Sequence, residues 1–376
     1  MHKRVCYAVD LFLICDIIML KKGQGDIILE KKKLSKKAKT IIITLTSIFL
    51  VLCIAAGGIF AYVHHLLGNM ERGEIKEEEL SINEEAFKGV DVVNIALFGI
   101  DARSDTNKGL SDAIIVFTLD KKHKKIKMTS IARDSYVKIE RESGVIKDKI
   151  THAYGFYKDS GPQLSIKALN QNFDLNITDY ITVNFFGFSQ IIDALGGVMV
   201  DVDEHEMMIM NREYVTHLNE IGIKCDPITE TGLQLLTGPQ ALAYSRNRYT
   251  GNDVDRGNRQ KEVIAAVYDK MKTTSVNKLP ELASMGLSHC ETSLTNAEII
   301  ELAFWVLKNP CTMENISLPD DECNPKGGLD AFVNGVWYYI YDIDIAKQKL
   351  HDFINEEGKY YKATEAPVTE NSSVAQ

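Results

Sequence analysis

The chain has 376 residues, of which 45% are hydrophobic and 25% are charged, and its formal net charge is −9 at pH 7. A chain of this length and composition can bury one large core or two modest ones. Residues 1–39 carry ten Lys and Arg against four Asp and Glu, so the remainder is strongly acidic, which excludes nucleic acid as the expected partner.

An apolar segment follows the basic N-terminal residues. Residues 40–63 run for 24 positions without a charge, enough for a helix to cross a hydrocarbon core of ~30 Å. Six lysines lie directly before it, and cationic flanks stay cytoplasmic. We therefore expect a single-pass membrane protein with residues 1–39 inside and the acidic part outside. A cleaved signal peptide is the alternative, although its apolar core is usually shorter.

A weaker apolar run lies upstream, from Val5 to Leu20, and two aspartates interrupt it. Charges at the centre of a membrane helix are costly, so this run is either an interfacial helix or sequence that precedes a true start at Met19. The sequence leaves both possibilities open.

The outer part divides into three segments. Residues 64–90 are rich in glutamate and predict a solvated stem, residues 91–362 a folded domain, and residues 363–376 a disordered tail. No Cys or His spacing typical of zinc occurs. Four outer cysteines are either paired in disulfides or free and buried, and the sequence does not choose between these states: Cys225, Cys290, Cys311 and Cys323.

Apolar patterning predicts an α/β domain. Strands are expected at 92–100, 113–119 and 126–132, with a polar turn at 120–124. A helix is expected at 164–173 and another at 188–195, the latter closed by Gly196-Gly197 and bracketed by strands at 180–185 and 198–202. Thr237-Gly238-Pro239 opens a short helix through Tyr244, and residues 254–271 predict a longer one with Val263, Ile264, Val267 and Met271 inward. Helices should therefore cover a central sheet.

Acidic and basic side chains follow the ends of the predicted strands. If the first strand ends at Asp101, the second starts at Asp112 on the same sheet edge, and the third returns to that edge at Arg133. Two carboxylates and a guanidinium suit a divalent cation that bridges to phosphate oxygens. The alternative is that the aspartates only cap loops.

Arginine is concentrated in one short stretch. The chain has ten arginines, and four of them lie between Arg246 and Arg259. A helix that begins near Val254 would project Arg256 and Gln260 from one face, while Arg246 and Arg248, two apart in an extended segment, would point the same way. Because guanidinium matches phosphate oxygens bidentately, the stretch predicts a pyrophosphate clamp. Surface ion pairs with Asp253 and Asp255 are the alternative.

Several motifs at characteristic spacing resemble the LytR-CpsA-Psr family of envelope glycan transferases. The matching stretches cover about 91–271 and are 94–101, 111–112, 130–134, 149–155, 193–198 and 236–244, the last running into the arginine stretch. A cytoplasmic N-terminus with one anchor is similar to the family's organisation.

This resemblance implies an α/β sandwich that holds a polyprenyl pyrophosphate, with its lipid tail in an apolar tunnel. It further implies Mg²⁺ held by Asp101 and Asp112, and an acid near the reacting phosphate at Asp253. By the same resemblance, the pyrophosphate-binding groups are Arg133, Arg246, Arg248, Arg256 and Gln260. Leu110 and Ala132 depart from the family pattern, and Arg103 is the residue that could replace the arginine expected at 110.

Apolar residues at 185–192 have two interpretations. Phe185, Phe186, Phe188 and Ile192 are candidates for the lipid tunnel, and plain core packing is the alternative. His152 lies in a family motif without a sequence-level partner, which favours a structural role.

The resulting hypothesis is a membrane-anchored phosphotransferase that moves a glycan phosphate from a polyprenyl-pyrophosphate carrier to peptidoglycan, with Arg133, Arg246 and Asp253 as catalytic residues. One alternative is a pyrophosphatase that releases the glycan phosphate to water. Another is a noncatalytic envelope sensor or transcription attenuator. No motif identifies the polymer that is carried, whether teichoic acid, capsule or another glycan. No motif indicates the oligomeric state either.

Overall fold

The computed structural model describes residues 17–22, 27–32, 44, 49–50, 57–58, 61–68, 70–100, 109–249, 253–275, 289–324 and 330–356. The chain divides into two compact units, Met1–His64 and His65–Gln376. In the first unit, β1 (Ile17–Lys22) and β2 (Ile27–Lys32) form an antiparallel hairpin. Within the described part of the chain, no helix combines the length and hydropathy needed to cross a bilayer. Most of residues 40–63 and all of the tail lie outside the described residues.

A mixed sheet of seven strands organises the second unit, in the order β13-β6-β5-β4-β9-β12-β3. The three predicted strands are present as β4 (Val92–Ile100), β5 (Ser111–Asp120) and β6 (Lys125–Ile131), and all three are antiparallel to their chain neighbours. The predicted strand near 180 is β9 (Asp179–Asn184), parallel to β4. Three further strands complete the sheet: β3 (Glu71–Arg72), β12 (Cys290–Thr292) and β13 (Thr312–Leu318).

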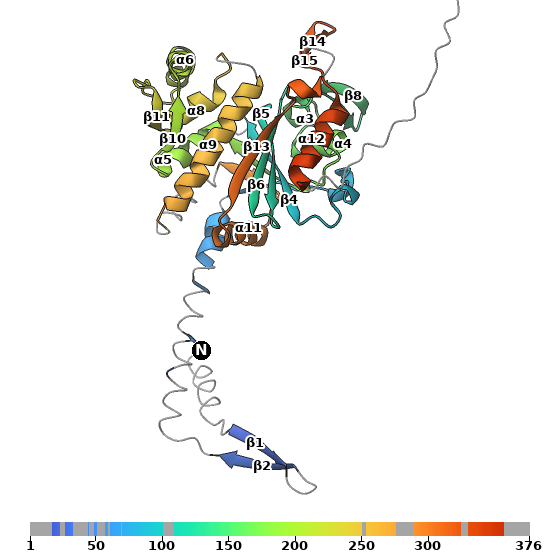
Figure 1. Ribbon diagram of the computed structural model, residues 1–376, viewed down its shortest axis with the longest axis vertical. Coiled ribbons are helices and arrows are strands. Elements are labelled where there is room, and N and C mark those ends of the chain that lie inside the picture. The colour runs from blue at the N-terminus through green and yellow to red at the C-terminus, as the bar shows by residue number, and fades with distance from the viewer. Residues whose placement is uncertain are drawn as a thin grey trace, which may run out of the picture. The chain divides into compact units, whose positions relative to one another are not determined.

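Helices cover both faces of this sheet, as the sequence predicts (Figure 1). On one face, α3 (His152–Gly155), α4 (Pro162–Phe173) and α12 (Ile343–Asn355) bury the main core with Ala96, Phe98 and Val116. On the other, α9 (Asp253–Thr273) lies on β6 and β13, and α11 (Asn296–Lys308) packs near the β5–β6 turn. The expected α/β architecture is therefore confirmed.

A smaller sheet stands beside the large one and has its own core. The predicted strand–helix–strand unit exists as β9, α5 (Phe185–Ala194) and β10 (Val198–Val202), but β10 does not return to the sheet of β9. It pairs instead with β11 (Gly232–Leu236). Gly197 makes this turn with φ +87°, and a Cβ there would lie 2.7 Å from the Leu236 carbonyl oxygen. Around this sheet lie α6 (Glu204–Ile209), the π-helical turn η3 (Met210–Val215), α7 (Thr216–Glu220) and α8 (Gly238–Arg246).

Short hairpins and turns complete the unit. They are β7 (Tyr136–Arg141) with β8 (Gly144–Lys149), β14 (Asp330–Val333) with β15 (Val336–Tyr339), and the 3-10 turns η1 (Glu77–Glu79), η2 (Glu85–Phe87) and η5 (Asp321–Cys323).

Several details differ from the pattern-based expectations. Although the glutamates of 64–90 favour a solvated stem, Leu80, Ala86 and Phe87 are buried in the main core, because a few apolar side chains suffice to hold an acidic segment on a domain. In α9, Val263 is fully buried as expected, whereas Met271, in the last turn of this helix, is 48% exposed. All four outer cysteines are buried, and none of them forms a disulfide.

Candidate active site

Asp112 occupies an irregular position at one edge of the large sheet. Gly99 pairs with Ala113 and Ile100 pairs with Ser111, so Asp112 is the extra residue of a β-bulge. Bulges re-aim side chains and are common beside active sites. The neighbouring candidates Asp101 and Arg103 fall outside the described residues.

Three arginines converge on Asp112. Arg133, which follows β6, donates from its guanidinium to Asp112 Oδ1, and Arg248 Nη2 lies 3.5 Å from the same oxygen. Arg256 donates from Nη2 to the backbone carbonyl of Asp112 at 2.8 Å. Residues more than 140 positions apart therefore meet at one strand end, and the arrangement concentrates guanidinium groups around a single carboxylate.

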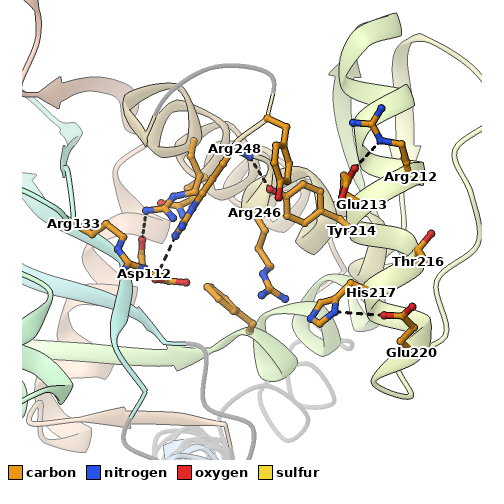
Figure 2. Close-up of a pocket in the computed structure, with 14 residues that line it drawn as sticks. Asp112, Arg133, Arg212, Glu213, Tyr214, Thr216, His217, Glu220, Arg246 and Arg248 are labelled. Atoms are coloured by element: carbon orange, nitrogen blue, oxygen red, sulfur yellow. Dashed lines mark hydrogen bonds and ion pairs between the residues drawn. The ribbon is translucent and has the colours of Figure 1, made fainter. Parts of the chain in front are cut away.

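These residues line a cavity of about 790 Å³. Figure 2 shows Asp112, Arg133 and Arg248 on one side of the cavity, with Arg246 projecting between them and the opposite wall. The lining residues are Asp112, Arg133, Phe185, Arg212, Glu213, Tyr214, Thr216, His217, Glu220, Arg246, Arg248, Tyr249, Arg256 and Gln260.

Arg246 reaches the cavity from the end of a well-fixed helix. Thr237 and Gln240 form a capping box at the start of α8. Gly238 lies against α5 so closely that a Cβ there would be 1.9 Å from the Ser189 carbonyl oxygen. Arg246 is the last residue of α8, and its guanidinium carbon lies 5.2 Å from the centre of the Phe185 ring. The sequence-based expectation of an extended segment from Arg246 to Arg248 was therefore wrong at Arg246.

Arg248 is fixed through its backbone. Its N–H donates to the Tyr214 hydroxyl at 2.9 Å, which ties the loop after α8 to η3. Burial raises the pKa of Tyr214, against the opposing effect of the Arg248 contact, so this hydroxyl stays protonated at neutral pH. Tyr214 can thus accept from Arg248 without carrying a charge into the cavity.

The first turns of α9 supply the remaining predicted groups. Arg256 and Gln260 are four residues apart on one helix face, are 3% and 8% exposed, and both line the cavity. Gly257 lets α9 approach β6, since a Cβ there would lie 2.5 Å from Ser130 Oγ. Asp253 is the first residue of α9, and its side chain lies outside the described part.

The candidate lipid-tunnel residues separate into different environments. Phe185 lines the cavity, whereas Phe186 is 46% exposed. Ile192 is fully buried in the core of the smaller sheet, and Phe188 packs against that core. His152 contacts Asp148 through Nδ1 at 2.8 Å and stacks on Phe156, outside the lining of the cavity.

The opposite wall of the cavity was not predicted from the sequence. It comes from η3, α7 and Tyr249, and it mixes Arg212 and His217 with acidic neighbours. Arg212 Nε lies 2.6 Å from Glu213, and His217 Nδ1 lies 3.9 Å from Glu220. Residues 211–220 carry no motif, and the only structural signal is the π-helical turn, a geometry frequent at functional sites.

One other acidic group lies far from this cavity. Among the described residues, Asp120, His123 and Glu356 could together contact a metal ion at the opposite end of β5. Lysines already neutralise them, with Lys127 Nζ 2.9 Å from Asp120 and Lys125 Nζ 2.7 Å from Glu356. Asp112 lies at the other end of β5, where it lines the cavity and contacts Arg133 and Arg248.

The chain matches a family model and known relatives over most of its length. The model of the LytR_cpsA_psr family matches residues 64–353. The chain is 32% identical over 324 residues to a polyisoprenyl-teichoic acid–peptidoglycan teichoic acid transferase TagU of Oceanobacillus iheyensis, covering 82% of this chain and 92% of the relative.

Two solved structures are similar across the domain. TagT bound to LIIa-WTA has a TM-score of 0.55 at 28% identity, over 70% of this chain and 91% of that one. A TagT structure with bound octaprenyl pyrophosphate lipid has a TM-score of 0.51 at 26% identity, over 70% and 90% of the two chains.

Proposed function

The chain belongs to the LytR-CpsA-Psr family, and we propose that it is a phosphotransferase that moves a teichoic acid or a similar glycan phosphate from a polyprenyl-pyrophosphate carrier to peptidoglycan. The names of its relatives support the reaction, and a related structure with a bound polyprenyl pyrophosphate supports the carrier. We also propose that residues 40–63 anchor it in the membrane, with residues 1–39 cytoplasmic and the second unit outside.

The observation that carries this proposal is the convergence of guanidinium groups on Asp112. Arg133 and Arg248 contact its carboxylate, Arg256 contacts its backbone, and Arg246 projects into the same cavity. A pyrophosphate carries several negatively charged oxygens, and one planar guanidinium group can donate to two such oxygens at once. The cavity is therefore matched to the charge of the carrier's head group rather than to a neutral sugar alone.

The chemistry follows from this placement. A hydroxyl oxygen of the wall attacks the phosphorus atom that is bonded to the glycan, and a new O–P bond forms. The bond from that phosphorus to the bridging oxygen breaks, and polyprenyl phosphate leaves with the electron pair. Arginine side chains neutralise the charge that grows on the leaving phosphate, which is the main demand of phosphoryl transfer. We assign Asp253, at the first turn of α9, to accept the proton of the attacking hydroxyl.

Magnesium is the proposed cofactor, and the donor chemistry fits it. Among the described residues, both arginine contacts of the Asp112 carboxylate are to Oδ1, so Oδ2 remains available as a hard oxygen ligand. Asp101 directly follows Ile100, the residue that pairs with Ser111, and is the second proposed ligand. When bound, Mg²⁺ would supply further charge neutralisation at the phosphates.

Reconstitution of the full-length protein tests the assignment. Wild type, Arg246→Ala and Arg246→Lys would be incubated with lipid-linked glycan in the presence and absence of peptidoglycan. Glycan covalently attached to the wall with wild type, and its loss in both variants, supports transfer through guanidinium contacts. Free glycan phosphate as the sole product would instead show a pyrophosphatase, and lipid binding without any turnover would show a sensor.

A further inference from the structure

Helix α11 is unusually apolar for a helix on the surface. Nine of its 13 residues are apolar, in the sequence NAEIIELAFWVLK, yet none of the 13 is buried. A helix that is apolar around most of its circumference normally lies inside a core or against another apolar phase. The packing of α11 on the domain therefore leaves a second face without a partner among the described residues.

The two faces of α11 are distinct. On the inner face, Leu302, Trp305 and Val306 pack against Leu119 and Ile126, at the sheet end opposite to Asp112. The outer face has helical spacing of three and four residues, and two of its members are strongly exposed, Phe304 at 66% and Leu307 at 75%. We call this outer face, made of Ala297, Ile300, Phe304 and Leu307, the α11 apolar face.

The position at which the chain enters the second unit, next to α11, indicates the partner of this face. Strand β3 pairs with β12, and the Arg72 guanidinium donates to the Leu294 carbonyl and to the Asn296 side chain, at the start of α11. Arg72 also donates to the Leu67 carbonyl at 3.2 Å.

Chain length then places the bilayer nearby. Arg72 lies nine positions after Val63, the end of the proposed anchor. Even fully extended, nine residues span only about 30 Å. Because Arg72 is held at the start of α11, the start of this helix lies within about 30 Å of the surface into which the proposed anchor inserts.

Exposed lysines lie near the α11 apolar face, together with Glu301 of the same helix, which Lys121 contacts at 3.9 Å. Lys308 is exposed in the last turn of α11, and Lys122 and Lys124 are exposed in the β5–β6 turn at this end of the sheet. The Thr312 N–H donates to the Lys124 carbonyl at 3.3 Å, which brings that turn close to the end of α11. Lysines beside an apolar helical face are typical of segments that lie in the headgroup region of anionic bilayers.

We propose that the α11 apolar face docks on the outer leaflet of the membrane, with Phe304 and Leu307 inserted at the level of the lipid headgroups and acyl-chain ends. The proposal rests on the anchor and orientation given under the proposed function. It orients the sheet: β5 has ten residues and runs from the docked end to the arginine cavity, so the cavity lies roughly 30 Å from the bilayer surface. Docking would therefore hold the phosphate site at a fixed height above the membrane.

The experiment uses a pair of matched tryptophan variants of the full-length chain. The sequence has two tryptophans, Trp305 and Trp337, and both are first replaced in the background Trp305→Phe, Trp337→Phe. Phe304→Trp then places an indole on the α11 apolar face. Phe332→Trp is its control, because Phe332 is 72% exposed on β14, in the hairpin that contacts Asp134 at the sheet end near the cavity.

Each variant is placed singly in nanodiscs that contain phosphatidylcholine and phosphatidylglycerol, with and without brominated acyl chains. Bromine quenches indole only within contact range, so we expect fluorescence loss for Phe304→Trp and no loss for Phe332→Trp. Adding Leu307→Glu should reduce the quenching of Phe304→Trp. Equal signals from both positions, or no quenching at 304, would overturn the proposal. Quenching that needs two chains in one disc would also overturn it, in favour of a second copy as the partner.

Glycan transfer by the same samples separates this inference from the proposed function, because quenching requires no turnover. Transfer without quenching at 304 would overturn docking alone. Quenching at 304 without any transfer by wild type would support docking and contradict the transferase assignment.

Discussion

Arg259 and Glu206 form a buried ion pair at the back of the arginine stretch. Arg259 Nη1 donates to Glu206 Oε1 at 3.1 Å, and the two side chains are only 8% and 12% exposed. Arg259 Nη2 also donates to the Asn247 carbonyl at 2.8 Å, in the loop that carries Arg248. This arginine lies outside the cavity lining, and it fixes α9, α6 and the loop after α8 to one another.

We therefore predict that two arginines of the same stretch have opposite phenotypes. Arg259→Met leaves Glu206 buried without its partner and should cost about 3–5 kcal/mol of unfolding free energy. Arg246→Met removes a cavity side chain, so the melting temperature should change little while transfer falls by roughly 10²–10³-fold. Thermal unfolding and transfer assays on both variants check this. A stable Arg259→Met protein, or an Arg246→Met protein with full activity, would contradict the division of roles.

The contrast between these arginines shows which features of the site can be predicted from the sequence. Helical spacing puts Arg256, Arg259 and Gln260 close together on α9, because positions three and four apart share a face. The role of Arg259 depends on Glu206, which lies 53 positions earlier on a separate helix, and no local pattern connects them. Composition therefore picked out the arginine stretch that lines the cavity but could not separate the cavity arginines from Arg259.

A second buried cation, Lys261, predicts a pH dependence of stability. It is 1% exposed and donates from Nζ to the Ile316 carbonyl at 2.6 Å and to Ser317 Oγ at 2.8 Å. Burial lowers the pKa of Lys261 from 10.5 to about 8. Between these two values the unfolded chain binds more protons than the folded one, so this lysine makes stability rise with pH.

Relative to Lys261→Met, wild type should gain about 3 kcal/mol of unfolding free energy between pH 8 and pH 10.5. Below pH 8 the difference between the two proteins should be constant. Urea unfolding across this range measures it, and Lys308→Met, at an exposed position, is the matched control that should parallel wild type. A constant difference across the whole range would show that Lys261 stays protonated.

Some parts of the structure were not predicted from the sequence, and each has a physical reason. Strands β3 and β12 have two and three residues, too short for an apolar pattern. Strand β12 forms where the chain brings it beside β9, and β3 pairs with β12 in turn. The predicted strands β4, β5 and β6 carry long apolar runs that bury themselves in any α/β sheet. Likewise, the second wall of the cavity comes from a polar segment whose position depends on packing around β10 and β11.

The cysteines give a prediction about redox behaviour. Cys225, Cys290 and Cys323 are buried and form no disulfide, and burial raises the pKa of each thiol to about 11. Buried thiols in the neutral form react slowly. Alkylation followed by peptide mass spectrometry should label these positions only after denaturation, and a reductant should leave the melting temperature unchanged. Detection of any disulfide-linked pair of these peptides would contradict the prediction.

The position of Asp112 in the β4–β5 bulge leads to the prediction on metal dependence. Asp112→Asn keeps the size of the side chain and an oxygen for Arg133, but it removes the negative charge that attracts a divalent cation. Transfer by wild type should stop when EDTA removes Mg²⁺ and return when Mg²⁺ is restored, whereas Asp112→Asn should lose at least about 10²-fold in rate at every Mg²⁺ concentration.

His123→Ala is the control for this experiment, since it alters the other acidic group, at the far end of β5. Its transfer rate should follow Mg²⁺ in the same way as that of wild type, because lysines already neutralise Asp120 and Glu356 there. If His123→Ala instead abolished the response to Mg²⁺ while Asp112→Asn kept it, the cation would act at that far end. The arginines would then have to neutralise the pyrophosphate without a metal ion at Asp112.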